Sequence, residues 1–135
     1  MKIFVDTNVV IDYLADRAPF AEDAEAVIDV CVSDNHEGAF SGLSVCNAVY
    51  ILGKSIGRRA AELLLKEVAT LIDILPIDPG DIKSNLGADH HDFEDSLQIA
   101  AARSWGADII VTRDKTGFAN SPIKVMTPAE FLNSI

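Results

Sequence analysis

The chain has 135 residues, of which 21 are acidic and 11 are basic, so its formal net charge is −10, and 49% of its residues are hydrophobic. This length predicts one domain, spanning residues 1–135, that buries a substantial core, and the hydrophobic fraction excludes an intrinsically disordered chain. The charge argues against a nucleic-acid partner unless the acids are gathered in one place to bind metal, because phosphate binding usually requires a basic surface.

The N-terminal stretch MKIFVDTNVVID has one lysine, and its short apolar run is interrupted by Asp6. This is not the pattern of a signal peptide, and no part of the chain approaches the ~18 apolar residues of a membrane span. We therefore expect a cytoplasmic protein with no membrane segment. Cys31 and Cys46 lie in apolar helical patterns without the spacing of a metal site, so we expect both to be buried free thiols.

Short β-rich runs alternate with amphipathic helical patterns along the whole sequence. Glycines end two of the helical patterns, and a threonine followed by proline opens the last one. In chain order we predict a strand at Lys2–Val5, helices at Val9–Leu14 and Phe20–Val32, a strand at Gly38–Ser41, helices at Leu43–Ser55 and Arg58–Leu71, a strand at Asp73–Ile77, helices at Asp81–Leu86 and Asp92–Trp105, strands at Ile109–Thr112 and Ile123–Met126, and a closing helix that Thr127 caps.

The alternation of strands with helices predicts an α/β fold with a parallel sheet. The all-apolar run Ile109–Thr112 is typical of a central strand, whereas a proline near its end favours an edge position for Asp73–Ile77. Ligand sites in such sheets form beyond the carboxyl ends of the strands. We therefore expect the polar residues that follow or close three of the strands to lie on one edge of the sheet: Asp6, Ser41 and Asp114.

Four acids each fall at a strand end or a helix start, although they are distant in sequence: Asp6, Asp92, Asp95 and Asp114. Carboxylates that converge on one edge repel one another, and they stay ionised at neutral pH if a divalent cation lies between them. Oxygen-only ligands suit Mg²⁺ or Mn²⁺, and such a site can activate water and hold a scissile phosphate for in-line attack. The metal would also cancel the negative charge that repels nucleic acid.

Each of these acids also has a purely structural interpretation. Asp6 can cap the helix that follows it, and Asp114 can be a turn residue. Asp92 is a good N-cap with Asp95 three residues on, and acids in a first helical turn suit the helix dipole. Asp95 is harder to explain in this way, because the helical spacing turns it inward, whereas Glu94 should point outward as a surface acid. The functional interpretation depends on the four acids together.

The segments VDTNVVIDYL, SGLSVCNAVYIL, DFEDSLQIAAA and IIVTRDKTGF occur in this order along the chain. Together they resemble PIN domains, the metal-dependent nuclease family of VapC-type toxins, in a subgroup with a D-F-E-D motif. The resemblance implies a three-layer α/β/α, Rossmann-like fold with a central, mainly parallel sheet. It also implies metal ligation and catalysis by Asp6, Asp95 and Asp114, with Asp92 as an additional catalytic acid.

The resemblance also implies supporting roles for three polar residues. Asn8 would fix the Asp6 loop, Thr112 would orient water or the phosphate, and Thr7 would support the site. The implied activity is that of an endoribonuclease that acts on structured RNA with Mg²⁺ or Mn²⁺ and leaves a 5′-phosphate. Family members of this kind usually form homodimers, and a cognate antitoxin protein neutralises them.

One position departs from the family pattern. PIN domains commonly have a glutamate in the helix after the second strand, and the equivalent residue here is Asn47. Asparagine can ligate a metal through its carbonyl oxygen but brings no charge, and no acid lies between Gly38 and Ala61 to replace the glutamate. A second metal position should therefore be weaker. Either Asp92 compensates, or activity is low or lost. The alternatives are then a PIN-like module that binds RNA or protein, or a structural dimer whose acidic surface serves only solubility.

Two other classes fit less well. Haloacid-dehalogenase-type phosphatases also open on a strand-end aspartate but need a second acid two residues on, where this chain has Asn8. A phosphate-receiver domain needs an acid pair near its start and a late lysine. Neither class explains Asp92 and Asp95 on one helix. His90 and His91 are adjacent in a polar loop, where neighbouring side chains diverge, so we expect surface residues.

Basic residues are few and uneven in their distribution. Lys54, Arg58 and Arg59 are either ordinary solvated side chains or an RNA-contacting rim. Arg113 and Lys115 flank Asp114 and are the better-placed candidates for contact with substrate phosphates, which requires exposed basic groups.

Overall fold

The computed structural model describes the whole chain from Met1 to Ile135. The strands are β1 (Lys2–Val5), β2 (Glu37–Ser41), β3 (Asp73–Leu75), β4 (Ile109–Val111) and β5 (Lys124–Met126). The helices are α1 (Thr7–Leu14), α2 (Ala21–Cys31), α3 (Gly42–Ile56), α4 (Arg58–Val68), α5 (Pro79–Asn85), α6 (Phe93–Trp105) and α7 (Pro128–Asn133), and a short 3₁₀ helix, η1 (Thr116–Phe118), lies between β4 and β5.

All five strands are parallel, in the spatial order β3-β2-β1-β4-β5. This confirms the predicted parallel sheet, with β4 inside it and β3 at an edge. β1 lies in the centre, where Phe4 pairs with Ala39 of β2 and Val5 pairs with Val111 of β4. The chain first runs from β1 to one edge and then returns to build the other half. The carboxyl ends of β1 and β4 therefore form the switch point at which α/β sheets commonly bind ligands.

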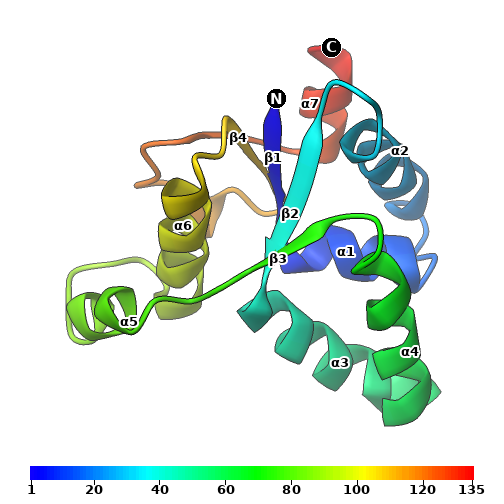
Figure 1. Ribbon diagram of the computed structural model, residues 1–135, viewed down its shortest axis with the longest axis horizontal. Helices are drawn as coiled ribbons and strands as arrows, with labels where there is room; N and C mark the ends of the chain where they lie inside the picture. Colours follow the sequence, from blue (N-terminus) through cyan, green and yellow to red (C-terminus); the bar gives the residue numbers. More distant parts are fainter.

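Helices cover both faces of the sheet, which confirms the three-layer α/β/α architecture. Figure 1 shows α5 and α6 on one side of the sheet and α1, α2 and α7 on the other, with α3 and α4 side by side as a helical hairpin (Gly42–Val68). Successive residues of a strand point to opposite faces. Ile3 and Val5 of β1 accordingly join the larger core cluster with α1, α2 and α7, whereas Phe4 packs with Ala101 and Ala102 of α6.

Several element ends follow the signals in the sequence. Asp92 caps α6, and Thr127 caps α7 by accepting the N–H of Glu130. Gly57 and Gly106 follow α3 and α6 with positive φ angles of 90° and 84°, which glycine adopts without strain. The sequence therefore determines where α6, which carries the D-F-E-D motif, begins and ends.

Two expectations need correction. α4 ends at Val68 and not at Leu71, because the chain leaves the helix through a turn in which the N–H of Leu71 donates to the carbonyl of Val68. Cys46 is exposed on α3, so Cys31 is the only buried thiol of the two. The sequence of α3 is apolar well beyond the stripe that the core covers, so its periodicity does not separate the covered face from the open one.

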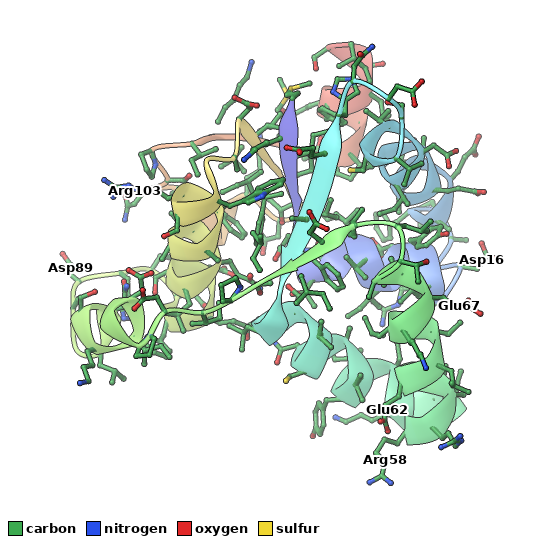
Figure 2. The ribbon with its side chains drawn as sticks, viewed as in Figure 1. Asp16, Arg58, Glu62, Glu67, Asp89 and Arg103 are labelled. Carbon is green, nitrogen blue, oxygen red and sulfur yellow. The ribbon has the colours of Figure 1, made fainter.

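Charged side chains lie around the outside of the molecule (Figure 2). Arg58 and Glu62 pair at 3.4 Å on α4, with 86% and 58% of their side chains exposed, which fits the interpretation of this region as an ordinary solvated surface. Exposed ion pairs of this kind contribute little to stability. None of the helices combines the length and the apolar character needed to span a bilayer.

Gly38 of β2 has no room for a side chain. A Cβ at this position would lie 2.5 Å from Cβ of Cys31 and 2.8 Å from Cγ2 of Ile72. Gly38→Ala should therefore lower the free energy of unfolding by about 1–3 kcal/mol, the usual range for overpacking a core. Gly42→Ala is the control, because a Cβ there meets only the carbonyl oxygen of Leu75 at 3.6 Å. Urea denaturation measures both variants, and equal stabilities would contradict the close packing at Gly38.

Candidate active site

The predicted acids lie where β1 and β4 end. Asp6 directly follows β1, Asp114 lies in the loop after β4, and α6 brings Asp95 to the same place. These residues line a pocket of about 420 Å³. We call it the acidic pocket, and its polar lining includes Asp6, Asn8, Asn47, Glu94, Asp95 and Asp114.

Asp6 is held from both sides. Only 6% of its surface is exposed. Its Oδ1 accepts the N–H of Thr7 at 2.8 Å, which caps α1, and its Oδ2 accepts the hydroxyl of Thr112 at 2.8 Å. Thr112 is fully buried. Its hydroxyl therefore orients Asp6 and does not reach water or a phosphate, which corrects the role expected for this residue.

Asn8 ties the ends of β1 and β4 together. Its Oδ1 accepts the N–H of Arg113 at 3.2 Å, and its Nδ2 donates to Oγ1 of Thr112 at 3.4 Å. The same hydroxyl is the one that donates to Asp6, so Asn8 braces the loop that carries Asp6. This geometry agrees with the supporting role expected for Asn8.

The basic residues near the pocket differ from those predicted. The guanidinium of Arg113 donates to both carboxylate oxygens of the buried Asp12, at 2.7 and 3.3 Å, and Lys115 pairs with Glu130 at 2.9 Å. Both predicted phosphate contacts are thus engaged within the protein. Arg17 lines the acidic pocket instead, with 44% of its side chain exposed. Sequence reasoning missed Arg17 because it lies outside the four recognisable segments, in the loop between α1 and α2.

Asp95 faces inward from the first turn of α6, as predicted, and packs against η1. A Cβ at Gly117 would collide with Oδ2 of Asp95, so only glycine leaves room for the carboxylate. Phe118, the next residue, is buried against α6 and holds η1 in place. The turn TGF after Asp114 therefore forms one wall of the acidic pocket, a role that the sequence pattern did not indicate.

Asp114 lies at the exposed rim of the pocket. Its Oδ1 accepts the N–H of Thr116 at 3.0 Å, which makes it a turn residue as well as a pocket residue. This hydrogen bond to the Thr116 backbone holds the pKa of Asp114 below its usual value, and the nearby charges of His91 and Arg113 act in the same direction. Asp114 is therefore the acid most readily ionised on the open side of the pocket.

Asp92 does not line the acidic pocket. Its Oδ1 accepts the N–H of Asp95 at 2.9 Å as the N-cap of α6. Its side chain lines a neighbouring cavity of about 590 Å³ between α5 and α6, together with His90 and His91. The structural interpretation of Asp92 is thus confirmed. Its effect on the site is indirect, through the position of Asp95 and through its own charge. Both histidines line this cavity, where His91 is exposed, as expected for a surface residue, and His90 is half-buried.

Glu94 is exposed, as expected of a surface acid, but it has a partner that the sequence did not indicate. Its Oε1 accepts Nδ2 of Asn47 at 2.6 Å, and the side chain lines the acidic pocket. Burial raises the pKa of Glu94, as does the charge of Asp92, while the hydrogen bond from Asn47 lowers it. α6 therefore contributes two adjacent acids, Glu94 and Asp95, to one pocket.

A buried polar cluster lies beneath the acids. Gln98 of α6 is fully buried, and its Oε1 accepts the hydroxyl of Ser41 at 2.6 Å. Its Nε2 donates to Oγ of Ser44 at 2.9 Å and to Oγ1 of Thr7 at 3.3 Å. These bonds fix α6 against the first turns of α1 and α3, and a fully satisfied network of this kind specifies one arrangement. A glutamine within the apolar run that follows the D-F-E-D motif was the sequence signal for it.

The acids in the pocket repel one another. Burial raises the pKa of Asp6 from 3.8 to about 6, against the hydrogen bonds from Thr112 and Thr7, and the charges of Glu94 and Asp114 raise it further. Burial also raises the pKa of Asp95 to about 7, with added repulsion from Asp6 and the other acids. Carboxylates whose pKa values are perturbed in this way are usually part of a functional site.

The donor set fits a hard divalent cation. Every acidic ligand in the pocket is a carboxylate, and no cysteine or histidine lines it, which is the chemistry of Mg²⁺ or Mn²⁺. No group of three or more acidic, histidine or cysteine side chains is already arranged to hold a metal ion, so the fit depends on the chemistry of the donors. The carboxylate lining is of the kind that Mg²⁺ binds while keeping several waters.

Comparison with known proteins gives the family. The family model described as the PIN domain matches residues 2–116. The chain belongs to the PIN domain family. It is 27% identical over 135 residues to ribonuclease VapC1 of Aquifex aeolicus, an alignment that covers 96% of this chain and 92% of that protein.

Several solved structures share the fold. VapBC2 of Rickettsia felis, solved bound to a DNA fragment from its promoter, has a TM-score of 0.70 at 16% identity, covering 94% of this chain and 98% of that chain. VapC20 of Mycobacterium tuberculosis, described as a sarcin-ricin loop cleaving toxin, has a TM-score of 0.70 at 15% identity over 87% of this chain and 94% of that chain. A toxin-antitoxin complex of Klebsiella pneumoniae has a TM-score of 0.69 at 21% identity, covering 93% of this chain and 97% of that chain.

Gln98 should be essential to the stability of this PIN domain. Gln98→Met removes the amide bonds to three buried hydroxyls, and we expect the free energy of unfolding to fall by about 2–3 kcal/mol, since each unsatisfied group has a desolvation penalty. Leu97→Met, a similar-volume change at the adjacent buried position, should have an effect below about 1.5 kcal/mol. Urea denaturation compares the two, and a Gln98→Met variant as stable as Leu97→Met would contradict the bracing role of the network.

Asp95 should destabilise the protein at neutral pH when divalent cations are removed. Its folded pKa of about 7 lies above the unfolded value near 3.8, so its ionisation opposes folding progressively between these two values. In EDTA, Asp95→Asn should therefore gain stability over the parent as pH rises from 4.5 to 7.5. We expect about 1–2 kcal/mol, a figure reduced for the solvent screening of a half-exposed group. Denaturation at the two pH values measures this, and a pH-independent difference would contradict the repulsion.

Proposed function

We propose that this PIN domain is a divalent-metal-dependent endoribonuclease and the toxin of a toxin–antitoxin pair. The observation that carries the proposal is the convergence of carboxylates from β1, α6 and the loop after β4 in one open pocket. The relatives support the choice of substrate and partner. VapC1 is a ribonuclease, VapC20 cleaves the sarcin-ricin loop, and several neighbours in fold were solved as toxin–antitoxin complexes.

In this proposal Asp6, Asp95 and Asp114 hold Mg²⁺ or Mn²⁺. When bound, such a cation activates water for attack on a phosphodiester and neutralises charge on the phosphate oxygens. Asp6 is already oriented by Thr7 and Thr112, so its position does not need to be organised when a substrate arrives. Asp114 lies on the open rim, where a bulky RNA strand can approach.

Arg17 is the basic residue best placed to contact the substrate. It lines the acidic pocket with an exposed side chain, and its closest acid, Asp12, lies 3.9 Å from Nη1. Asp12 is already paired more closely with Arg113. Arg17 is therefore free to donate to a phosphate oxygen, and a single such contact positions the backbone without reading the base sequence.

The helical hairpin supports the proposed protein partners, an antitoxin and a second copy of the chain. Several large apolar side chains are exposed along it, among them Tyr50 at 67%, Ile56 at 46% and Leu63 at 51%. Tyr50 also lines the acidic pocket together with Ile51. An antitoxin that covers this surface would reach the site itself, which suits neutralisation by direct obstruction.

RNA cleavage tests the proposed function. The parent should cleave a structured RNA pool with Mn²⁺ or Mg²⁺ and lose this activity in EDTA. Asp6→Asn and Asp95→Asn should each reduce the rate by about 100-fold or more, the scale for losing a group essential to the chemical step. Glu67→Gln, which removes one exposed acid of α4 (Figure 2), is the charge-matched control and should cleave like the parent.

Equal cleavage by the parent and by both Asn variants would contradict the catalytic assignment. A parent that binds RNA without metal-dependent cleavage would instead support the alternative of a PIN-like binding module with a weakened site. Asn47 is the observation that favours this alternative, because it lacks the charge of the glutamate that is common at this position.

A further inference from the structure

Glu94 is the pocket acid to which neither the family pattern nor the sequence motifs assign a role at the site. It stands one residue before Asp95 in the first turn of α6, and successive residues on a helix point about 100° apart. Asp95 packs against η1, whereas Glu94 accepts a hydrogen bond from Asn47 of α3. The two acids of α6 therefore face the pocket from different sides.

Asn47 fixes the direction of Glu94. The amide Nδ2 of Asn47 donates to Oε1 of Glu94 at 2.6 Å, so one carboxylate oxygen is engaged and Oε2 stays available to a ligand. Asn47 lies on α3, whose first turn is held by Ser41 and by the buried network around Gln98. The orientation of Glu94 is thus built on the same frame that positions Asp6 and Asp95.

The orientation of Glu94 is unfavourable unless something binds between the acids. An exposed glutamate has many rotamers that point to water, and Glu94, although exposed, lines the same pocket as Asp6, Asp95 and Asp114. One hydrogen bond from a neutral amide contributes little free energy compared with the cost of ordering a long side chain near like charges. A cation shared with Asp6 and Asp95 accounts for the arrangement.

We propose that Glu94, oriented by Asn47, is the fourth carboxylate of the metal site. Glu94 of α6 would supply the negative charge that a glutamate at position 47 brings in other family members. This inference depends on the proposed function, because it assigns a residue to the same site. It replaces Asp92, which caps α6 and lines another cavity, as the acid that compensates for Asn47.

Mn²⁺ titration calorimetry and RNA cleavage on four proteins test the assignment: the parent, Glu94→Gln, the exchange variant Asn47→Glu/Glu94→Gln, and the control Glu67→Gln. Glu94→Gln should weaken Mn²⁺ binding by about tenfold or more and slow cleavage, since carboxylate number sets affinity. The exchange variant returns the acid to the pocket from α3 at the parent net charge. It should recover Mn²⁺ affinity to within a few-fold of the parent.

The outcomes separate the two proposals. A Glu94→Gln variant that matches Glu67→Gln in Mn²⁺ affinity and cleavage would overturn the role of Glu94, while a cleaving parent would leave the proposed function intact. An exchange variant that regains nothing would also overturn the inference that the two positions are equivalent. A parent that neither binds Mn²⁺ nor cleaves RNA would overturn both proposals. Thermal melting of each variant confirms that the loss is not one of folding.

Discussion

Repulsion between carboxylates is the constraint around which this structure is organised. Asp6 follows the first strand and Asp95 lies on α6, and burial together with the charges of neighbouring acids raises the pKa of Asp6 to about 6 and that of Asp95 to about 7. Folding alone would favour keeping them apart. They stay together because hydrogen bonds from the surrounding polar groups fix their positions, a pattern that is typical of functional sites.

The groups that hold the acids come from every element that meets at the carboxyl edge of the sheet. Thr112 fixes Asp6 from the end of β4, and Gln98 joins α6 to the first turns of α1 and α3. Gly117 leaves the space that Asp95 occupies. The parallel sheet makes this possible, because it brings the ends of β1 and β4 side by side although they are far apart in the sequence. The stability of the fold and the geometry of the pocket thus depend on the same hydrogen bonds.

Much of this arrangement could be predicted from the sequence. Strand and helix periodicity gave the α/β class, and the glycines and caps at the ends of α3, α6 and α7 gave boundaries close to those observed. The parallel topology was enough to predict that Asp6 and Asp114 lie at the same edge of the sheet. What could not be predicted was the direction of side chains whose partners are remote: Glu94 lines the acidic pocket beside Asn47, and Arg113 pairs with the buried Asp12. Local spacing gives no information about such pairings.

In the proposed function, Asp6 and Asp95 bind the same divalent cation. The most direct measurement is an anomalous difference map from a crystal of the protein soaked in Mn²⁺ near pH 7.5. A peak within about 2.0–2.3 Å of carboxylate oxygens from both Asp6 and Asp95, the distance of a hard-cation bond, is the predicted result. A map with no peak in the acidic pocket, in crystals that leave the pocket open to solvent, would contradict it.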